Sequence, residues 1–236
     1  MTIPPASKAA YVRALFGAIA PRYDLMNRLM TGGRDRAWRR LAAREAAATP
    51  GAWLLDLAAG TGDLTLALAR QYPSAAIAAL DFSQPMLARG KRKVEAAGVS
   101  EQVCFLVGDA LRIPFATAIF DAVTSAFMLR NVADLPRAFA EMARVTRPGG
   151  RVVCLELSRP TAPFFRALFW VYFAGLVPIV GRNLSRHGSA YRYLPDSLAE
   201  FVDTEELKRI MQSAGLRDVT YRRLMGGTVA IHVGMI

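Results

Sequence analysis

Acidic side chains follow three apolar segments of this sequence, each near the point where a predicted strand ends. Asp56 and Asp63 flank a glycine turn, Asp81 ends the second segment and Asp109 ends the third. Each aspartate alone fits a helix cap or a turn. Ligands of open parallel sheets bind outside the carboxyl ends of the strands, so the four aspartates would share one site. Together they favour a nucleoside ligand.

Two of these positions suit particular parts of a nucleoside. Asp81 suits the ribose hydroxyls, because a carboxylate can accept two hydrogen bonds from a cis diol. Asp109, together with the backbone of Ala110, suits the amino edge of adenine.

The glycine turn narrows the class of nucleoside. Glycine adopts backbone conformations closed to other residues and lets a ligand approach its N–H groups. A dinucleotide fingerprint would need a third small residue at the position of Thr65, so the nicotinamide interpretation is disfavoured.

The spacing Asp56-x-Ala58-x-Gly60-x-Gly62 instead resembles the cofactor loop of S-adenosylmethionine-dependent methyltransferases, with Ala58 at the usual first glycine. The backbone of Gly60 and Gly62 and the side chain of Thr61 would then face the methionine end of the cofactor.

The elements that must position these residues alternate along the chain. Alternation of strand-like and helical patterns predicts a parallel, doubly wound sheet with helices on both faces. A helix over 204–214 and an antiparallel hairpin then close the sheet. The predicted fold is α/β, the Rossmann-like class I methyltransferase fold, with seven strands and an antiparallel last strand. The strands are predicted over 53–57, 75–80, 103–107, 120–127, 151–157, 218–224 and 229–233.

The chain of 236 residues fits one domain, 1–236, with recognisable parts. Residues 1–50 read as a helical lid with one apolar face, broken at Pro21, and residues 51–158 as the cofactor-binding core. The strand and helix rhythm stops at 159–200, an apolar and basic insertion for substrate. Residues 201–236 supply the closing helix and hairpin.

The charge and composition of the chain are compatible with several classes of binding partner. Thirty basic and nineteen acidic side chains give a net charge of +11, and nine of the basic residues lie in the first fifty. Nucleic acid, an anionic membrane and anionic small molecules all fit such a charge. The longest apolar run, 167–180, is shorter than the ~20 residues of a membrane span. No secretory signal is visible, so we expect a cytoplasmic protein.

The two cysteines indicate neither a disulfide framework nor a metal site. Cys104 and Cys154 both stand within apolar strand-like segments and are predicted to be core residues. We therefore expect no metal.

Several segments together resemble the ubiquinone/menaquinone biosynthesis C-methyltransferases. The resemblance runs from about Tyr11 to the last residue and implies an enzyme that uses S-adenosyl-L-methionine to methylate a ring carbon of a polyprenylated quinol. Phe82 and Met86 join the implied cofactor contacts. The segments are Phe16-x-x-Ile19-Ala20-x-x-Tyr23-Asp24-x-x-Asn27, the Asp56–Asp63 loop, Asp81-Phe82-Ser83-x-x-Met86, Gly108-Asp109-Ala110, Leu129-Arg130-Asn131-Val132, Leu155-Glu156-Leu157-Ser158 and Tyr191-x-Tyr193-Leu194.

The resemblance places catalytic candidates after the fourth strand and in the lid. Arg130 and Asn131 could bind and polarise the quinol oxygens, with Arg130 acting by its charge or by holding a water that accepts the proton. An ion pair or a helix-start contact is an equally good explanation of Arg130. Tyr23 could close over the site or simply be core. His232 is more simply a core residue, and His187 a surface residue.

Two residues depart from the family's pattern. Where members can read Ser-Phe-Gly-Leu-Arg-Asn, this chain has Ala126 and Met128. A cofactor contact by that serine cannot be carried over, and Met128 adds bulk near the cofactor.

Other functions stay open at this point. The chain lacks the Asn/Asp-Pro-Pro-aromatic motif of amine methylation and a nucleophilic cysteine loop, which argues against an RNA methyltransferase and against nucleic acid as a partner. Another small-molecule methyltransferase and a non-catalytic cofactor-binding protein remain alternatives. The aromatic insertion suits a prenyl tail and peripheral contact with the inner face of the plasma membrane. For most of its aromatic residues, an ordinary place in the core is the simpler explanation. Between the two rings we favour naphthoquinol (demethylmenaquinol) over the methoxy-benzoquinol. A homodimer is one option for the oligomeric state.

Overall fold

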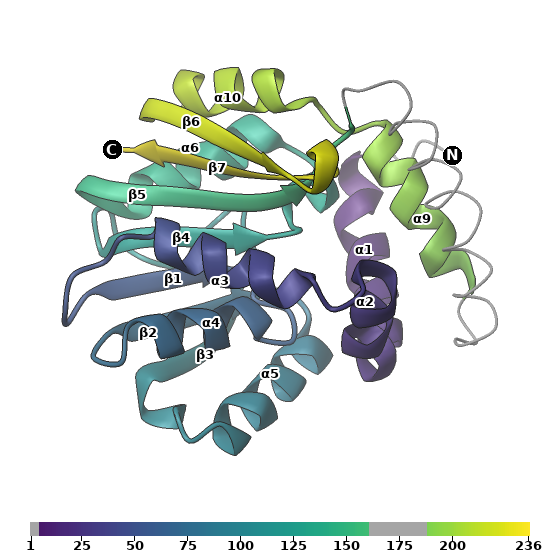
Figure 1. Ribbon diagram of the computed structural model, residues 1–236, viewed down its shortest axis with the longest axis horizontal. Coiled ribbons are helices and arrows are strands. Elements are labelled where there is room, and N and C mark those ends of the chain that lie inside the picture. Colours follow the sequence, from purple (N-terminus) through teal and green to yellow (C-terminus); the bar gives the residue numbers. More distant parts are fainter. Residues whose placement is uncertain (1–4, 161–187) are drawn as a thin grey trace.

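A seven-stranded sheet in the order β3-β2-β1-β4-β5-β7-β6 forms the centre of the molecule (Figure 1). The computed structural model describes residues 5–160 and 188–236, so the apolar run 167–180, most insertion aromatics and His187 lie outside the described residues. Among the described strands, β7 runs antiparallel to both of its neighbours and all other pairs are parallel, which confirms the predicted class I methyltransferase fold. The strands are β1 Trp53–Leu57, β2 Ala76–Asp81, β3 Val103–Val107, β4 Phe120–Ala126, β5 Thr146–Leu157, β6 Arg217–Leu224 and β7 Val229–Met235.

The two faces of the sheet are covered by different helices because successive strand residues point to opposite sides. Leu54 packs with the helices just before β1 and just after the glycine loop, whereas Leu55 packs with two helices from later in the chain. Both leucines are fully buried. The helices of the first face are α3 Asp35–Glu45, α4 Asp63–Gln71 and α5 Gln84–Ala96; those of the second are α6 Leu135–Val145 and α10 Thr204–Ser213.

The N-terminal helices stand across the carboxyl ends of the strands, beside α9 Gly188–Ala199 (Figure 1). Helix α1 covers Pro5–Ile19, the short turn η1 covers Ala20–Arg22 and α2 covers Tyr23–Thr31. The break at Pro21 was predicted, and the left-handed backbone of Gly32 ends α2 as glycine typically does. Helices α1 and α2 of the predicted lid and helix α9 of the predicted insertion thus lie at the edge of the sheet where ligands bind, whereas α3 packs on one face of the sheet. The predicted boundaries of the parts stay a prediction.

Two sequence predictions were wrong. Cys104 is exposed rather than in the core, because β3 is an edge strand whose side chains are at best half-buried. Strand β5 begins at Thr146 instead of residue 151, since Thr146 already pairs with Phe120, and the register shifts between Phe120 and Ala122. Ser83 precedes α5 but makes no capping hydrogen bond with its hydroxyl, and its backbone N–H donates to Asp81.

Candidate active site

The loop between β1 and α4 is bent by residues with left-handed backbone. Ala58 has φ +57° and Gly62 has φ +77°. Glycine suits position 62, because the backbone there is left-handed and a Cβ atom would lie only 3.1 Å from the Cα atom of Gly90. The loop is therefore pressed against α5, with Gly62 turned away from the pocket that Gly60 lines.

Asp81 ties this loop to the end of β2. Its Oδ2 atom accepts a hydrogen bond from the Gly60 N–H at 2.9 Å, and its Oδ1 atom accepts one from the Ser83 N–H at 2.7 Å. Burial raises the pKa of Asp81 to about 6, although these N–H groups favour the charged form. The carboxylate keeps lone pairs for a diol, so its geometry suits the predicted ribose contact.

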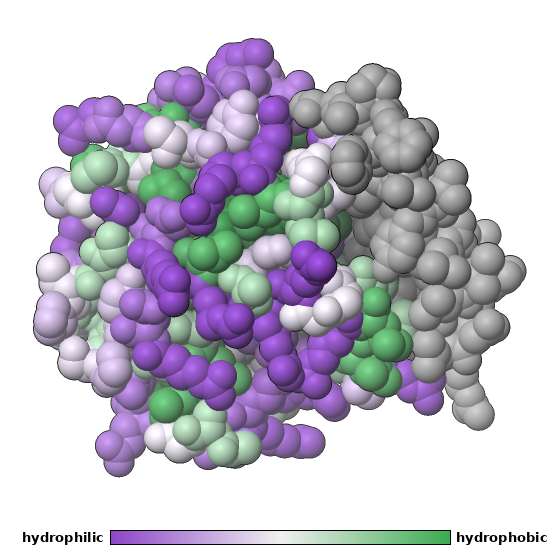
Figure 2. Space-filling view, in the orientation of Figure 1, coloured by the Kyte–Doolittle hydropathy of each residue, from purple (hydrophilic) through white to green (hydrophobic). Residues whose placement is uncertain are grey.

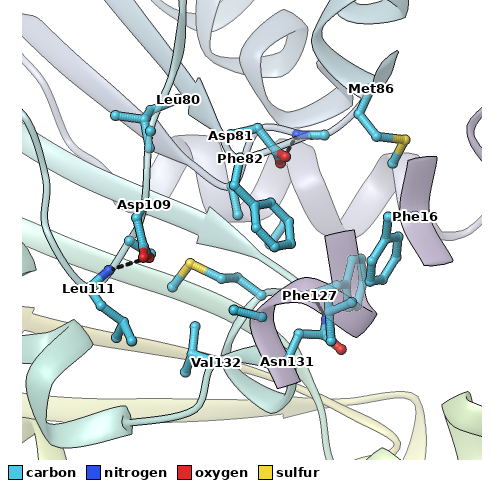
Figure 3. Close-up of a pocket in the computed structure, with 18 of the residues that line it drawn as sticks. Phe16, Leu80, Asp81, Phe82, Met86, Asp109, Leu111, Phe127, Asn131 and Val132 are labelled. Carbon is cyan, nitrogen blue, oxygen red and sulfur yellow. Dashed lines mark hydrogen bonds between the residues drawn. The ribbon is translucent and has the colours of Figure 1, made fainter. Parts of the chain in front are cut away.

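A pocket opens between these strand ends and the lid (Figure 3). Its empty space is about 790 Å³, including solvent at the mouth. Acidic side chains from β2 and from the segment after β3 share it with aromatic rings, as Figure 3 shows for Asp81, Asp109, Phe16, Phe82 and Phe127. The predicted cofactor residues that line it are Gly60, Asp81, Phe82, Met86, Asp109 and Ala110.

A small polar chamber continues this pocket beneath the glycine loop. Tyr23, Gly60 and Ala126 line both spaces. The chamber adds the buried guanidinium of Arg39 and the carboxylates of Asp56 and Asp63, with Thr61 in its wall. Such a set of one cation and two anions fits the ammonium and carboxylate of a methionine.

Asp56 is the most constrained acid of the chamber. It is fully buried, and its Oδ2 atom accepts a hydrogen bond of 2.5 Å from the Thr65 hydroxyl. Its Oδ1 atom has no partner, and burial raises the pKa of Asp56 to about 7. This unpartnered oxygen can accept a hydrogen bond from a ligand, and the ammonium group of S-adenosylmethionine is such a donor.

Thr61 lines the chamber and also contacts the lid and α5. Its hydroxyl donates to Asp24 Oδ1 at 2.6 Å and lies 3.1 Å from Lys93 Nζ. Lys93 also forms ion pairs with Asp24 at 2.7 Å and with Asp63 at 2.6 Å. We call these four residues the Lys93 cluster. It fastens the lid helix α2 to the cofactor loop and to α5.

Tyr23 and Asn131 face the pocket, in agreement with where they were expected. Tyr23 lines both spaces, and burial raises the pKa of its phenol, so the group is a hydrogen-bond donor rather than a base at neutral pH. The Asn131 Nδ2 group donates to the Phe127 carbonyl at 3.0 Å, while Asn131 Oδ1 is buried without a partner. Asn131 therefore has an acceptor to offer a substrate hydroxyl.

Arg130 lies behind the pocket rather than in its wall. Its Nη1 atom forms an ion pair with Glu156 on β5 and donates to the Phe127 carbonyl at 3.1 Å. Both Arg130 and Glu156 are buried. The ion pair that sequence reasoning weighed as one explanation is present, and Arg130 lines a second, larger cavity next to the pocket.

The second cavity joins the pocket at Val132 and Ala133, which line both. Its walls come from α1, the turn η3 Leu129–Asn131, α9, the start of α6 and the segment before α10, and its empty space is about 2080 Å³ with the solvent at its mouth. Apolar side chains such as Leu129 and Phe201 line much of it.

The two departures from the family pattern both fall in the pocket wall. Ala126 lines the pocket and the chamber, and Met128 is buried in the pocket wall. The expected bulk of Met128 near the ligand space is thus present.

Sequence reasoning missed Lys93, Glu156 and Arg39. Lys93 stands in an ordinary amphipathic helix, and Glu156 was quoted only as part of a motif. A signal was available for Glu156, since a charged residue inside an otherwise apolar strand pattern implies a buried partner.

His232 lies away from both cavities. Its Nε2 atom is 3.0 Å from the Thr204 carbonyl oxygen, its Nδ1 atom has no partner, and burial lowers its pKa. The expected core position is correct, with one ring nitrogen unsatisfied. Over residues 5–160 and 188–236, no group of three potential metal ligands occurs, and no helix there has the length and apolar character to span a membrane.

The chain is similar to known proteins over nearly its whole length. The profile of the ubiE/COQ5 methyltransferase family matches residues 5–236. The chain is 44% identical to the demethylmenaquinone methyltransferase of Roseiflexus sp. (strain RS-1), over 98% of this chain and 96% of that protein. It is 47% identical to the demethylmenaquinone methyltransferase of Thermus thermophilus, over 93% of this chain and 99% of that protein.

Solved structures agree on the fold. The crystal structure of the [4+2]-cyclase SpnF superimposes with a TM-score of 0.72 at 18% identity, covering 95% of each chain. At this identity the likeness concerns the fold alone.

Proposed function

We propose, from the premise that the chain belongs to the ubiE/COQ5 methyltransferase family of S-adenosylmethionine-dependent C-methyltransferases, that it converts demethylmenaquinol to menaquinol. The methoxy-benzoquinol of ubiquinone synthesis is the second candidate ring. The observation that carries the proposal is one pocket in which nucleoside-binding acids, Asn131 and the apolar lid meet, next to a larger cavity with apolar walls.

The residues present fit the cofactor along the two connected spaces. Asp81 would hold the ribose, Asp109 and Ala110 the adenine, and Phe82 and Met86 the apolar faces of the nucleoside. Arg39 and Asp56 would hold the methionine end, beside the backbone of Gly60. When bound, S-adenosylmethionine supplies a methyl group that its sulfonium already activates.

The protein's own task is to prepare the acceptor carbon. A quinol carbon becomes nucleophilic as the neighbouring hydroxyl loses its proton, and an ordinary phenol has a pKa near ~10. Asn131 would accept a hydrogen bond from that hydroxyl and fix the ring, while Tyr23 donates one from the lid. The titratable residues described in the pocket wall are Tyr23, Asp81 and Asp109, so the proton would leave to water at the mouth.

Arg130 would assist through its charge. Arg130 precedes Asn131 in the sequence, and its guanidinium donates a hydrogen bond to the Phe127 carbonyl. The same carbonyl accepts a hydrogen bond from the Asn131 side chain. A cation at this depth stabilises a developing phenolate, although Glu156 reduces the effect. Arg130 would also fix the position of Asn131 through the shared carbonyl.

The tail of the substrate would leave the pocket through the second cavity, past Val132 and Ala133. A polyprenyl chain needs such apolar walls, and α9 of the insertion contributes Tyr193 and Ser197 to them. We also propose that the enzyme contacts the inner face of the plasma membrane peripherally, because its substrate is held in the bilayer.

The test is methyl transfer to chemically reduced demethylmenaquinol and to the matching methoxy-benzoquinol, with both products detected by mass. We expect a gain of one methyl on the naphthoquinol and none when the quinone is left oxidised. Cofactor binding without methyl gain on either ring would overturn the proposal.

A further inference from the structure

Two leucines are unusually exposed on the lid helix α2. Leu25 is 50% and Leu29 is 51% exposed, although large aliphatic side chains are generally buried. The two lie one turn apart and share a face of the helix, and Arg28 lies on the same side, three residues from Leu25. Figure 2 shows an apolar surface at the position of α2, next to hydrophilic surface along α3.

A basic groove continues this surface. Between α2, α3 and α4 the groove is lined by seven basic side chains and one acidic side chain, which gives a net charge of +6. Arg28 lines it from α2, and Arg36 and Arg40 stand one turn apart on α3. The acids of the region are engaged already: Asp35 pairs with Arg39, and Asp63 with Lys93.

A third exposed apolar residue comes from the turn between β6 and β7, at the same edge of the sheet as the lid. Met225, in the turn between β6 and β7, is 45% exposed, and its Sδ atom lies 3.1 Å from Arg34 Nη1 in the turn before α3. Apolar side chains thus project beside arginines on α2 and in the β6–β7 turn, and α2 begins at Tyr23, which lines the pocket.

We propose that Leu25, Leu29 and Met225, with Arg28, Arg34, Arg36 and Arg40, form a docking surface for an anionic phospholipid bilayer. Aliphatic side chains enter the boundary between headgroups and acyl chains, while arginines bind the phosphates. A second copy of the chain is disfavoured because equal positive charges would face each other. Nucleic acid is disfavoured because these exposed side chains are aliphatic and offer no ring for base stacking.

This inference rests on the proposed function for one point: docking would bring the pocket to the membrane in which a lipid-tailed quinol resides. Vesicle binding can be measured without turnover, so the two proposals can fail separately. Binding without methyl transfer would leave the docking surface standing; methyl transfer without binding would overturn it.

The experiment is sedimentation of the full chain with vesicles of phosphatidylglycerol and phosphatidylcholine, compared with phosphatidylcholine alone. We expect binding to the anionic vesicles only, weakening with added salt. Leu25→Ser with Leu29→Ser should weaken it at least tenfold. Arg36→Gln with Arg40→Gln should weaken it roughly thirtyfold.

Matched controls remove equivalent side chains elsewhere. Val107→Ser takes away an exposed aliphatic group at the edge strand β3, and Arg209→Gln with Arg217→Gln takes away two exposed arginines near the C-terminus. These should leave vesicle binding unchanged. All variants should methylate a short-tailed quinol in solution at the wild-type rate.

Three results would overturn the proposal. One is equal binding by the docking variants and the wild type. The second is a wild-type dimer that the Leu25→Ser, Leu29→Ser variant dissociates, with no vesicle binding. The third is RNA binding that the Arg36→Gln, Arg40→Gln variant loses, again with no vesicle binding.

Discussion

Lys93 on α5 forms an ion pair with Asp24 on α2, with 2.7 Å between Nζ and Oδ2. This contact joins the lid to the body of the enzyme above the cofactor loop. The same Nζ atom lies 2.6 Å from Asp63 at the start of α4. A single cation thus holds together the lid, the loop and α4.

Removing that cation should loosen the lid and weaken cofactor binding. Lys93→Met leaves the carboxylates of Asp24 and Asp63 facing each other without a counter-charge. We expect the dissociation constant of S-adenosylmethionine to rise about tenfold, with a smaller change in kcat. Titration calorimetry and steady-state kinetics measure the two quantities. Lys91→Met, an exposed lysine on the same helix, is the control. An unchanged dissociation constant would contradict this role.

Variants of the Arg130–Glu156 ion pair can distinguish a structural role of the Arg130 charge from a catalytic one. Glu156→Gln leaves a buried guanidinium without its partner, which costs about 3–5 kcal/mol and should lower Tm by roughly 10 °C. Arg130→Gln with Glu156→Gln removes both charges and should recover much of that stability. Activity should stay low in the double variant, and its rate should rise with pH further into the alkaline range, because no cation assists deprotonation of the quinol. Full activity in the double variant would show that Arg130 is structural only.

Cofactor affinity should depend on the ionisation of Asp81. The pKa of Asp81 in the free enzyme is about 6, so the carboxylate is mostly charged at pH 7 and mostly protonated at pH 5. If it binds the ribose diol, affinity should fall about tenfold between pH 7 and pH 5. Asp81→Asn should bind more weakly at pH 7 and show a smaller pH dependence, with the remainder due to Asp56. Fluorescence titration at several pH values measures the affinity, and a pH dependence of the same size in the variant and the wild type would exclude the assignment.

Stability should respond to pH through Asp56. The pKa of Asp56 is raised to about 7 in the fold, above its ordinary value of 3.8. The unfolded chain therefore releases this proton first, and the free energy of unfolding should fall as pH rises from about 4 to about 7. Asp56→Asn keeps the acceptor for Thr65 and should reduce that slope by up to about 1.4 kcal/mol per pH unit. Urea denaturation from pH 5 to pH 8 checks it; an identical slope in the variant would disprove it.

Sequence reasoning located the parts of the site that depend on local pattern. Asp81 and Asp109 were predictable because a strand ending in an acid before a helix or turn is a local signal, and parallel strands end at one edge. Tyr23 and Asn131 came from the family resemblance rather than from spacing.

The contacts that were missed are long-range. Lys93 meets Asp63 thirty residues away, and Glu156 meets Arg130 twenty-six residues away. Neither distance is encoded in a periodicity, because it depends on how α5 and β5 pack against other elements. The exposure of Cys104 was missed for the same reason, since strand order decides which strand is at the edge.

The left-handed backbone of Ala58 affects how far the cofactor loop is preorganised before a ligand binds. This conformation costs a non-glycine residue about 1 kcal/mol. Glycine there would relieve the strain but give the loop more conformers, most of them wrong for binding. Compared with glycine, Ala58 thus makes the folded protein slightly less stable. In return, the loop has less conformational entropy to lose each time a cofactor binds.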